Sequence, residues 1–309
     1  MRYLMVIAFF LGCAQLKAQQ EPMYTHYSFN TSAVNPAYAG SRNVLTATSL
    51  TRFQWVNFDG APITQTLTLH SPLRNNKAGI GFNFVNDKIG PTNTSSLFGD
   101  IAVKIEMGKK AKLALGFKAG LRIRNNKLNE LSLNQTLDPK FQNNAMNEVS
   151  PNIGFGAYYH HPKFNFGFGI PYLLKTDFSA NFLSGSNEAF QERHLFFIAG
   201  GVIDLKKDGS LVLRPSTFLK LAKGAKPQLD VTALLYINKK FWFGPMIRTG
   251  DSFGALVGLP VTDQFSLGYS FDWSWGVNTG RYNTGGHELM LRYDFIFKNK
   301  GKVVSPSAF

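Results

Sequence analysis

The chain has 309 residues, 44% of them hydrophobic and 14% aromatic, and a formal net charge of +14. Its one cysteine, Cys13, excludes a disulfide framework and a thiolate metal site, since both need several cysteines. Beyond the first residues no apolar run approaches the eighteen or more that a membrane-spanning helix needs.

Residues 1–18 have the layout of a cleavable signal peptide. Arg2 precedes an apolar run that starts at Tyr3, and Leu16-Lys17-Ala18 precedes the polar Gln19. The residues ahead of Cys13 fit a lipoprotein cleavage site poorly. We expect an exported mature chain that starts near Gln19 and keeps most of the positive charge. Export argues against nucleic acid as the partner of that charge and favours an anionic membrane surface.

Residues 19–41 are rich in aromatic side chains but show neither strand alternation nor a helical stripe. Asn35-Pro36 and Gly40 are ordinary turn formers, so one interpretation is a turn-rich lead-in. The other is a small plug that folds into a barrel lumen or under its periplasmic mouth. Inward-facing glycines would leave room for such a backbone, and they are Gly79, Gly81, Gly116, Gly120, Gly154, Gly156, Gly167 and Gly169.

Residues 42–297 alternate between apolar and polar positions with a period of two. Between Lys112 and Arg124, every second residue from Leu113 to Ile123 is apolar. Such runs exceed the five or six residues of a common sandwich strand and match tilted membrane strands. The pattern predicts an all-β, transmembrane antiparallel barrel of about fourteen strands. The expected strands are 42–52, 62–71, 78–86, 95–106, 112–124, 151–160, 163–172, 193–205, 210–221, 227–237, 241–249, 252–260, 265–275 and 286–297.

The connections alternate between tight turns and longer loops. Residues 125–150 and 173–192 are long, and in outer-membrane barrels long loops face outside while short turns face the periplasm. We therefore expect both termini, including a tail at 298–309, to be periplasmic. Basic residues collect at the periplasmic rim, where anionic headgroups or an acidic protein would bind them. They are Arg74, Lys77, Lys109, Lys110, Lys163, Lys206, Lys207, Lys239, Lys240, Lys298, Lys300 and Lys302.

The inward face of the predicted strands carries charged residues. One hypothesis is a network of ion pairs that braces the wall; the other is a solute pore with anion preference. The residues concerned are Lys104, Glu106, Lys118, Arg122, Arg124, Arg214, Lys220, Arg248, Asp272, Arg292 and Asp294.

Nothing in the sequence predicts catalysis, a cofactor or a metal site. His287-Glu288 lacks a second histidine four positions after the first, so it is no zinc-protease motif. His160 and His161 are adjacent on a strand, so they point to opposite faces.

Several short motifs follow one another in chain order and together are typical of one protein family. Their residues are Tyr24, Tyr27, Phe29, Asn30, Asn35, Pro36, Ala37, Tyr38, Gly40, Arg52, Gln54, Trp55, Gly60, Pro62, Asp87, Gly90, His287 and Glu288. They resemble the PorP/SprF family of Bacteroidota outer-membrane proteins. The resemblance implies a place in the type IX secretion and gliding machinery. Family members of one kind partner, export or anchor a large surface adhesin through its C-terminal domain, and others join the periplasmic ring of the system. A passive porin remains a further alternative.

For the adhesin interpretation, we expect the partner to contact loop 125–150, loop 173–192 or the last loop near 276–285. These are the longest connections between the predicted strands. No individual contact residue is predicted.

Overall fold

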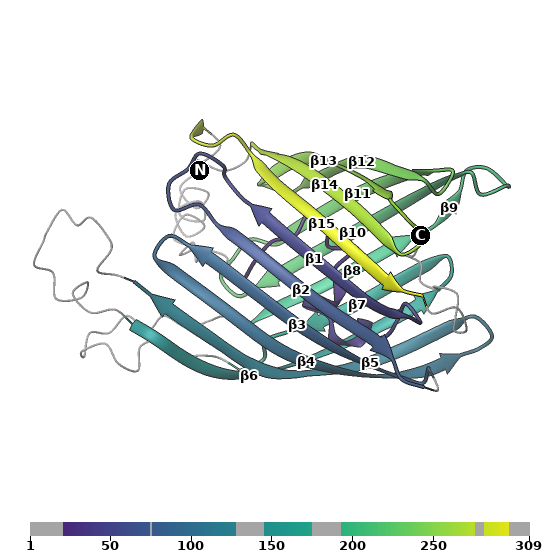
Figure 1. Cartoon of the computed structure of the whole chain (residues 1–309), viewed down its shortest axis with the longest axis horizontal. Coiled ribbons are helices and arrows are strands. Elements are labelled where there is room, and N and C mark those ends of the chain that lie inside the picture. Colours follow the sequence, from purple (N-terminus) through teal and green to yellow (C-terminus); the bar gives the residue numbers. More distant parts are fainter. Residues whose placement is uncertain (1–20, 75, 128–144, 175–192, 276–280, 297–309) are drawn as a thin grey trace, which may run out of the picture.

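The computed structural model describes residues 21–74, 76–127, 145–174, 193–275 and 281–296. The expected signal peptide, the C-terminal tail and most of both long loops lie outside these ranges. Within the described ranges, two short helices precede the strands, and Figure 1 shows the strands sloping across one continuous wall. The helices are α2 (Thr31–Val34) and η1 (Pro36–Tyr38). The strands are β1 (Leu45–Phe53), β2 (Ile63–Pro72), β3 (Ala78–Ile89), β4 (Thr92–Met107), β5 (Ala111–Asn126), β6 (Ala145–His161), β7 (Phe164–Ile170), β8 (His194–Gly201), β9 (Ile203–Asp204), β10 (Leu211–Ala222), β11 (Gln228–Ile237), β12 (Phe241–Arg248), β13 (Ser252–Pro260), β14 (Phe265–Ser274) and β15 (Gly286–Phe295).

The strands form a closed antiparallel barrel. Each strand pairs with its neighbours along the chain, and β1 pairs with β15 from Leu45↔Phe295 to Phe53↔His287, which closes the sheet. Strands β8 and β9 both pair with β10, because a single wall strand is interrupted at Val202. Fifteen strand segments therefore make fourteen wall strands, and the predicted fold is confirmed.

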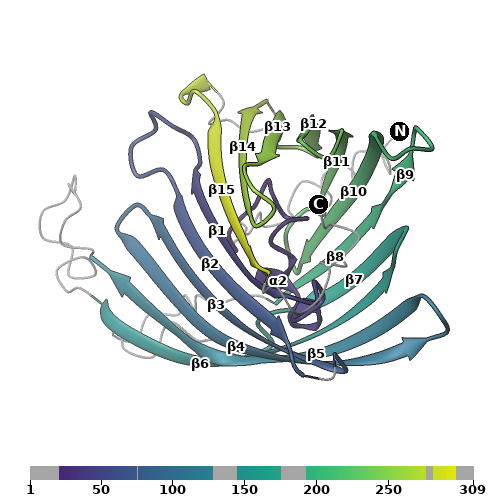
Figure 2. The same ribbon diagram turned by 45° about the vertical axis from the view of Figure 1, so that its right-hand side comes forward.

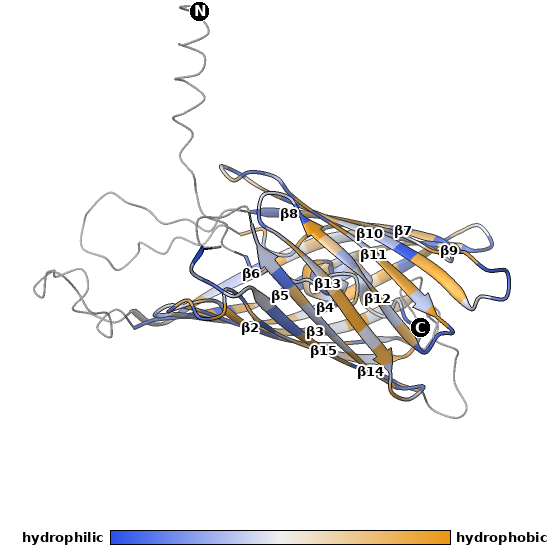
Figure 3. Cartoon of the chain, turned by 90° about the horizontal axis from the view of Figure 1, so that it is seen from above, coloured by the Kyte–Doolittle hydropathy of each residue, from blue (hydrophilic) through white to orange (hydrophobic). Residues whose placement is uncertain are grey.

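Alternating side chains explain the wall. Along β12, Phe241, Phe243 and Ile247 are exposed while Trp242 and Met246 are buried. The exposed apolar side suits lipid, and the inward side forms the only core that a single-layer barrel can have. Figure 3, coloured by hydropathy, shows apolar stretches along wall strands such as β14 and hydrophilic connections at the end near β9. No helix among the described residues is long and apolar enough to cross a membrane.

Several predicted strand ends were wrong. Strands β4, β5 and β6 run beyond 95–106, 112–124 and 151–160, because their hydrogen-bonded register continues past the apolar band, as at Arg124↔Glu148. Strand β7 stops at Ile170 rather than 172, since Pro171 has no N–H to donate. Tyr172, the last residue of the predicted strand 163–172, turns inward and packs on Phe98.

The two mouths of the barrel differ in their connections. We call the end that carries residues 108–110, 162–163 and 238–240 the turn mouth, and the opposite end the loop mouth. The basic residues predicted for one rim, as far as they are described, lie at the turn mouth. Residues 298, 300 and 302 of that set lie outside the described ranges.

Candidate functional site

The first described residues run through the inside of the barrel, and we call residues 21–44 the lumen segment. At the loop mouth, the Glu21 carboxylate lies 3.0 Å from Arg122 of β5, and Lys220 of β10 donates to the Glu21 carbonyl oxygen at 2.8 Å. Near the turn mouth, Lys104 of β4 donates to the Gly40 carbonyl oxygen. In Figure 2, helix α2 lies inside the curve of the sheet. The segment thus crosses the lumen from one mouth to the other.

This path separates the two ends of the described chain. The first and last barrel strands begin and end at the same mouth, because the number of wall strands is even. Glu21, the first described residue, lies at the loop mouth, opposite to the end of β15, because the lumen segment traverses the barrel before β1 begins. The expected periplasmic position of both termini stays a prediction, since the termini themselves lie outside the described residues.

Aromatic side chains of the segment fill the interior. Tyr27 stacks on Phe218, and its hydroxyl donates to the Ser216 carbonyl oxygen at 3.0 Å. Phe29 stacks on Trp242 with ring centroids 4.8 Å apart. The segment therefore contributes to the same core as the inward side of the wall.

The other motif residues of the segment are also in contact with the wall. Tyr38 meets the rings of His70 and Tyr158 edge-on. Thr66 donates to the Tyr24 hydroxyl at 3.2 Å, and Thr68 donates to Asn30 Oδ1 at 2.9 Å.

Asn35 and Pro36 fix the turn in the middle of the segment. Asn35 Oδ1 accepts from the Ala37 N–H at 3.0 Å, and Pro36 occupies the first position of η1, where a missing N–H costs nothing. Asn35 Nδ2 donates to the Ala157 carbonyl oxygen of β6 at 3.0 Å. This Asn-Pro pair is thus a helix cap that is also tied to the wall.

Wall glycines provide the space for this backbone. A Cβ atom at Gly79 would lie 2.2 Å from the Ala39 carbonyl oxygen, and one at Gly116 would lie 2.2 Å from the Ala37 nitrogen. Gly120 is different, because its nearest neighbour is Leu97 of the adjacent strand. The expected close approach therefore occurs, but not at every inward glycine.

Buried ion pairs connect the segment to the strands that close the barrel. Arg52 of β1 binds Asp272 of β14 at 2.7 Å and lies 3.7 Å from Glu288 of β15. Glu288 accepts from the backbone N–H groups of Thr25 and His26, at 2.9 and 2.7 Å, and contacts His26 Nδ1. Residues from the segment and from all three closing strands thus meet in one cluster.

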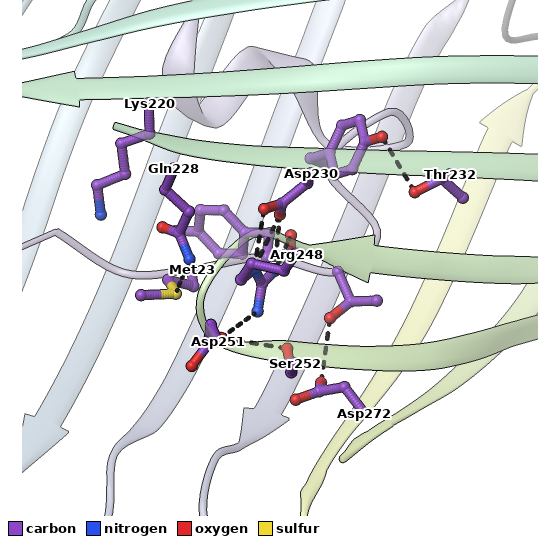
Figure 4. Close-up of polar contacts among 12 residues, drawn as sticks. Met23, Lys220, Gln228, Asp230, Thr232, Arg248, Asp251, Ser252 and Asp272 are labelled. Atoms are coloured by element: carbon purple, nitrogen blue, oxygen red, sulfur yellow. Dashed lines mark hydrogen bonds and ion pairs between the residues drawn. The ribbon is translucent and has the colours of Figure 1, made fainter. Parts of the chain in front are cut away.

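A second ion pair lies nearer the turn mouth. Arg42 binds Asp294 of β15 at 2.7 Å, and Thr46 donates to the same carboxylate. Figure 4 shows Arg248 between Asp230 and Asp251, with the Asp230 contact at 2.8 Å.

Of the remaining expected lumen charges, Glu106 is exposed, and the others have identifiable neighbours. Lys118 lies 3.6 Å from Asp100 and donates to the Ala33 carbonyl oxygen, and Arg292 donates to the Phe29 carbonyl oxygen. Arg214 lies over the ring of Tyr236, and Arg124 stands opposite Glu148 in the strand register. Such contacts are what the hypothesis of an ion-pair network bracing the wall requires. The alternative, a solute pore with anion preference, stays a prediction.

Several residues of this network escaped the sequence reasoning. Glu21 and His26 come from a stretch without periodicity, so no alternation marked them as inward. Arg42 opens the predicted strand 42–52 but was not among the expected lumen charges. Asp100 and Asp230 do alternate, but their partners stand on other strands or in the segment. Among the described residues, no group of three or more histidine, cysteine, aspartate or glutamate side chains is placed to hold a metal ion.

A cavity of about 580 Å³ opens at the loop mouth. Its floor is the start of the lumen segment, and its walls come from the β1–β2 loop, the end of β3, the β10–β11 loop and the β12–β13 turn. Four of the motif residues, distant in sequence, line it together. The lining residues are Glu21, Pro22, Met23, Gln54, Trp55, Pro62, Thr64, Asp87, Ile89, Lys226, Pro227, Gln228, Thr249, Gly250 and Asp251.

Two further motif residues shape the loops above this cavity. Gly60 and Gly90 both have positive φ, at 71° and 54°, and the Gly90 N–H donates to the Gly60 carbonyl oxygen at 2.9 Å. His287 is different, because it points to the outer face and contacts the Tyr269 hydroxyl at 2.6 Å. The motif residues thus fall into a lumen group, a cavity group and one outward histidine.

The wall has an apolar outer band, its first and last strands pair, and the lumen segment fills its polar interior. These features define an integral outer-membrane β-barrel. The family model described as "Type IX secretion system membrane protein PorP/SprF" matches residues 16–293. The chain belongs to this family, which confirms the family that the motifs predicted. No curated protein matches the chain significantly.

Solved structures with a similar fold are bacterial barrels of low sequence identity. The CymD monoaromatic hydrocarbon channel is 10% identical, with 85% of this chain and 92% of that chain covered and a TM-score of 0.50. The Acinetobacter baumannii outer-membrane protein Omp33 is 10% identical, with 83% and 100% covered and a TM-score of 0.45. A Pseudomonas aeruginosa FadL homologue is 11% identical, with 82% and 89% covered and a TM-score of 0.43. At such identities the likeness concerns the fold alone.

Proposed function

We propose that this barrel is a non-enzymatic outer-membrane protein that partners, exports or anchors a large adhesin secreted by the type IX system. Family membership supports a role in type IX secretion. The observation that carries the finer proposal is the division of the interior: the lumen segment occupies the core, whereas the cavity at the loop mouth is left open and is lined by Gln54, Trp55, Pro62 and Asp87. A barrel with a filled interior and a shaped outer mouth is suited to holding a partner rather than passing solutes.

Surface proteolysis tests this proposal. Intact cells of a deletion strain and of a complemented strain are treated with proteinase K, and the released peptides are identified by mass spectrometry. We expect one very large surface protein to disappear in the deletion strain and to return on complementation. An unchanged surface proteome in the deletion strain would contradict the proposal.

We also propose that the loop mouth faces outside the cell and the turn mouth faces the periplasm. In outer-membrane barrels the long loops are external, and the exposed lysines of the turn mouth suit anionic headgroups. With this orientation, Glu21 lies at the outer face and the end of β15 at the inner face.

Cysteine labelling checks this orientation. We expect Pro22→Cys and Lys226→Cys, both at the loop-mouth cavity, to react on intact cells with a maleimide that cannot cross the membrane. Lys239→Cys, in the β11–β12 turn, should react only after the cells are lysed. The reverse labelling pattern would show that the barrel has the opposite orientation in the membrane. Labelling of Lys226→Cys without labelling of Pro22→Cys would contradict the path of the lumen segment.

A further inference from the structure

The cavity at the loop mouth holds one carboxylate without an ionic partner. Glu21 is paired with Arg122, and Asp251 lies 3.4 Å from Arg248. Asp87 accepts a hydrogen bond from Thr64 Oγ1 at 2.6 Å, and no described cation lies within ion-pairing distance of it. A partly buried carboxylate in this position has one oxygen left for a donor that enters the cavity.

Apolar side chains line the cavity beside Asp87, among polar ones that include Lys226. Pro22, Pro62 and Pro227 line the cavity together with Trp55. Trp55 has a φ of 52°, a conformation that bulky residues rarely adopt and that surrounding structure must enforce.

That enforcement comes from the neighbouring loop. The Val56 N–H donates to the Gly285 carbonyl oxygen, and the Thr284 N–H donates to the Val56 carbonyl oxygen, both at 2.9 Å. The β1–β2 loop is therefore clamped to the β14–β15 loop directly beside Trp55. An aromatic wall fixed in this way is ready for a ligand before the ligand arrives.

We propose that the cavity binds an extended polypeptide segment, whose lysine or arginine side chain pairs with Asp87 while apolar residues on either side contact Trp55 and the prolines. This inference rests on the proposed function and names the chemistry by which the secreted partner is held. A neutral sugar or a hydrocarbon would bury Asp87 without neutralising it, which costs free energy. A folded domain does not fit into about 580 Å³, whereas a few extended residues do.

Peptide binding to the purified full chain tests the chemistry. The probes are a pool of blocked pentapeptides with a central lysine and random apolar flanks, a matched pool with central norleucine, and maltopentaose. Titration calorimetry should show binding of the lysine pool, with the norleucine pool at least about tenfold weaker. Asp87→Asn should lower the affinity for the lysine pool at least about tenfold and leave the norleucine pool unchanged.

Asp208→Asn, in the exposed β9–β10 turn, is the matched control and should bind as the wild type does. The inference is overturned by a lysine pool that does not bind, by equal binding of the two pools, by an unaffected Asp87→Asn variant, or by maltopentaose as the better ligand.

The surface proteolysis assay separates this inference from the proposed function. If the deletion strain loses the large surface protein while an Asp87→Asn strain retains it at the wild-type level, the cavity inference fails and the proposed function stands. If the deletion strain retains that protein, the proposed function fails whatever the peptides do. Reduced retention in the Asp87→Asn strain, with normal barrel levels, supports both.

Discussion

Arg52→Ala is expected to lower the stability of the folded barrel by about 3–5 kcal/mol, the usual cost of removing one partner from a buried ion pair. Arg52 is almost fully buried and binds Asp272 at 2.7 Å. Its loss leaves Asp272 and Glu288 buried beside each other without their cation. Because the three residues belong to β1, β14 and β15, the damage falls on the strands that close the barrel.

Urea unfolding of the barrel in lipid vesicles measures this effect. The variant should unfold at a clearly lower urea concentration than the wild type, and heated and unheated samples should differ less in electrophoretic migration. Lys239→Ala, at an exposed turn, should stay within about 0.5 kcal/mol. Arg52→Lys should fall between the two, since it keeps the charge but loses the planar fork. An Arg52→Ala variant as stable as the wild type would show that the cluster does not hold the closing strands.

The wall was predictable from sequence because each of its positions obeys a local rule. Lipid on one side and a crowded interior on the other force a period of two, and that pattern is visible wherever a strand lies in the apolar band. The rule fails where the band ends. Strands β4 to β6 continue past it with polar residues, and the break at Val202 leaves the alternation of 193–205 nearly intact.

The interior was less predictable because its contacts are not local. His26 and Glu288 are 262 residues apart, and Arg52 and Asp272 are 220 apart. Alternation indicated inward positions for Asp272 and Asp294, and Arg52 came from the family motif, but neither source says which of these residues meet. The lumen segment has no period at all, so its course from one mouth to the other followed only from the structure.

The motif residues gain a physical meaning from this arrangement. Tyr27, Phe29 and Tyr38 hold the segment by ring contacts, whereas Arg52 and Glu288 hold it by charge. A second group, which includes Trp55 and Asp87, surrounds the outer cavity. One set of motif residues thus holds the lumen segment in the interior. The other set forms the walls of the cavity at the loop mouth.

Closure of the interior has a direct electrical consequence. The wild-type barrel in a planar bilayer should be silent, because the lumen segment packs into the core and is bound at both mouths. A chain without residues 21–41 should show stable current steps, since a barrel of this strand number is wide enough to hold water once the segment is gone. Among the described residues, its buried charged side chains would then comprise nine cations and six acids. The current should accordingly prefer anions, as shown by the reversal potential in a KCl gradient.

A glycine substitution should also open the lumen, without any deletion. Gly116→Leu places a side chain where even a Cβ would lie 2.2 Å from the Ala37 nitrogen, so the segment must leave the wall and a leak should appear. Gly99→Leu, on β4, has nothing within 4 Å of its Cβ position and should stay silent. Steady conductance in the wild type would instead favour a passive porin. Silence in both the deletion and Gly116→Leu, with folded barrels, would mean that something other than the lumen segment blocks the path.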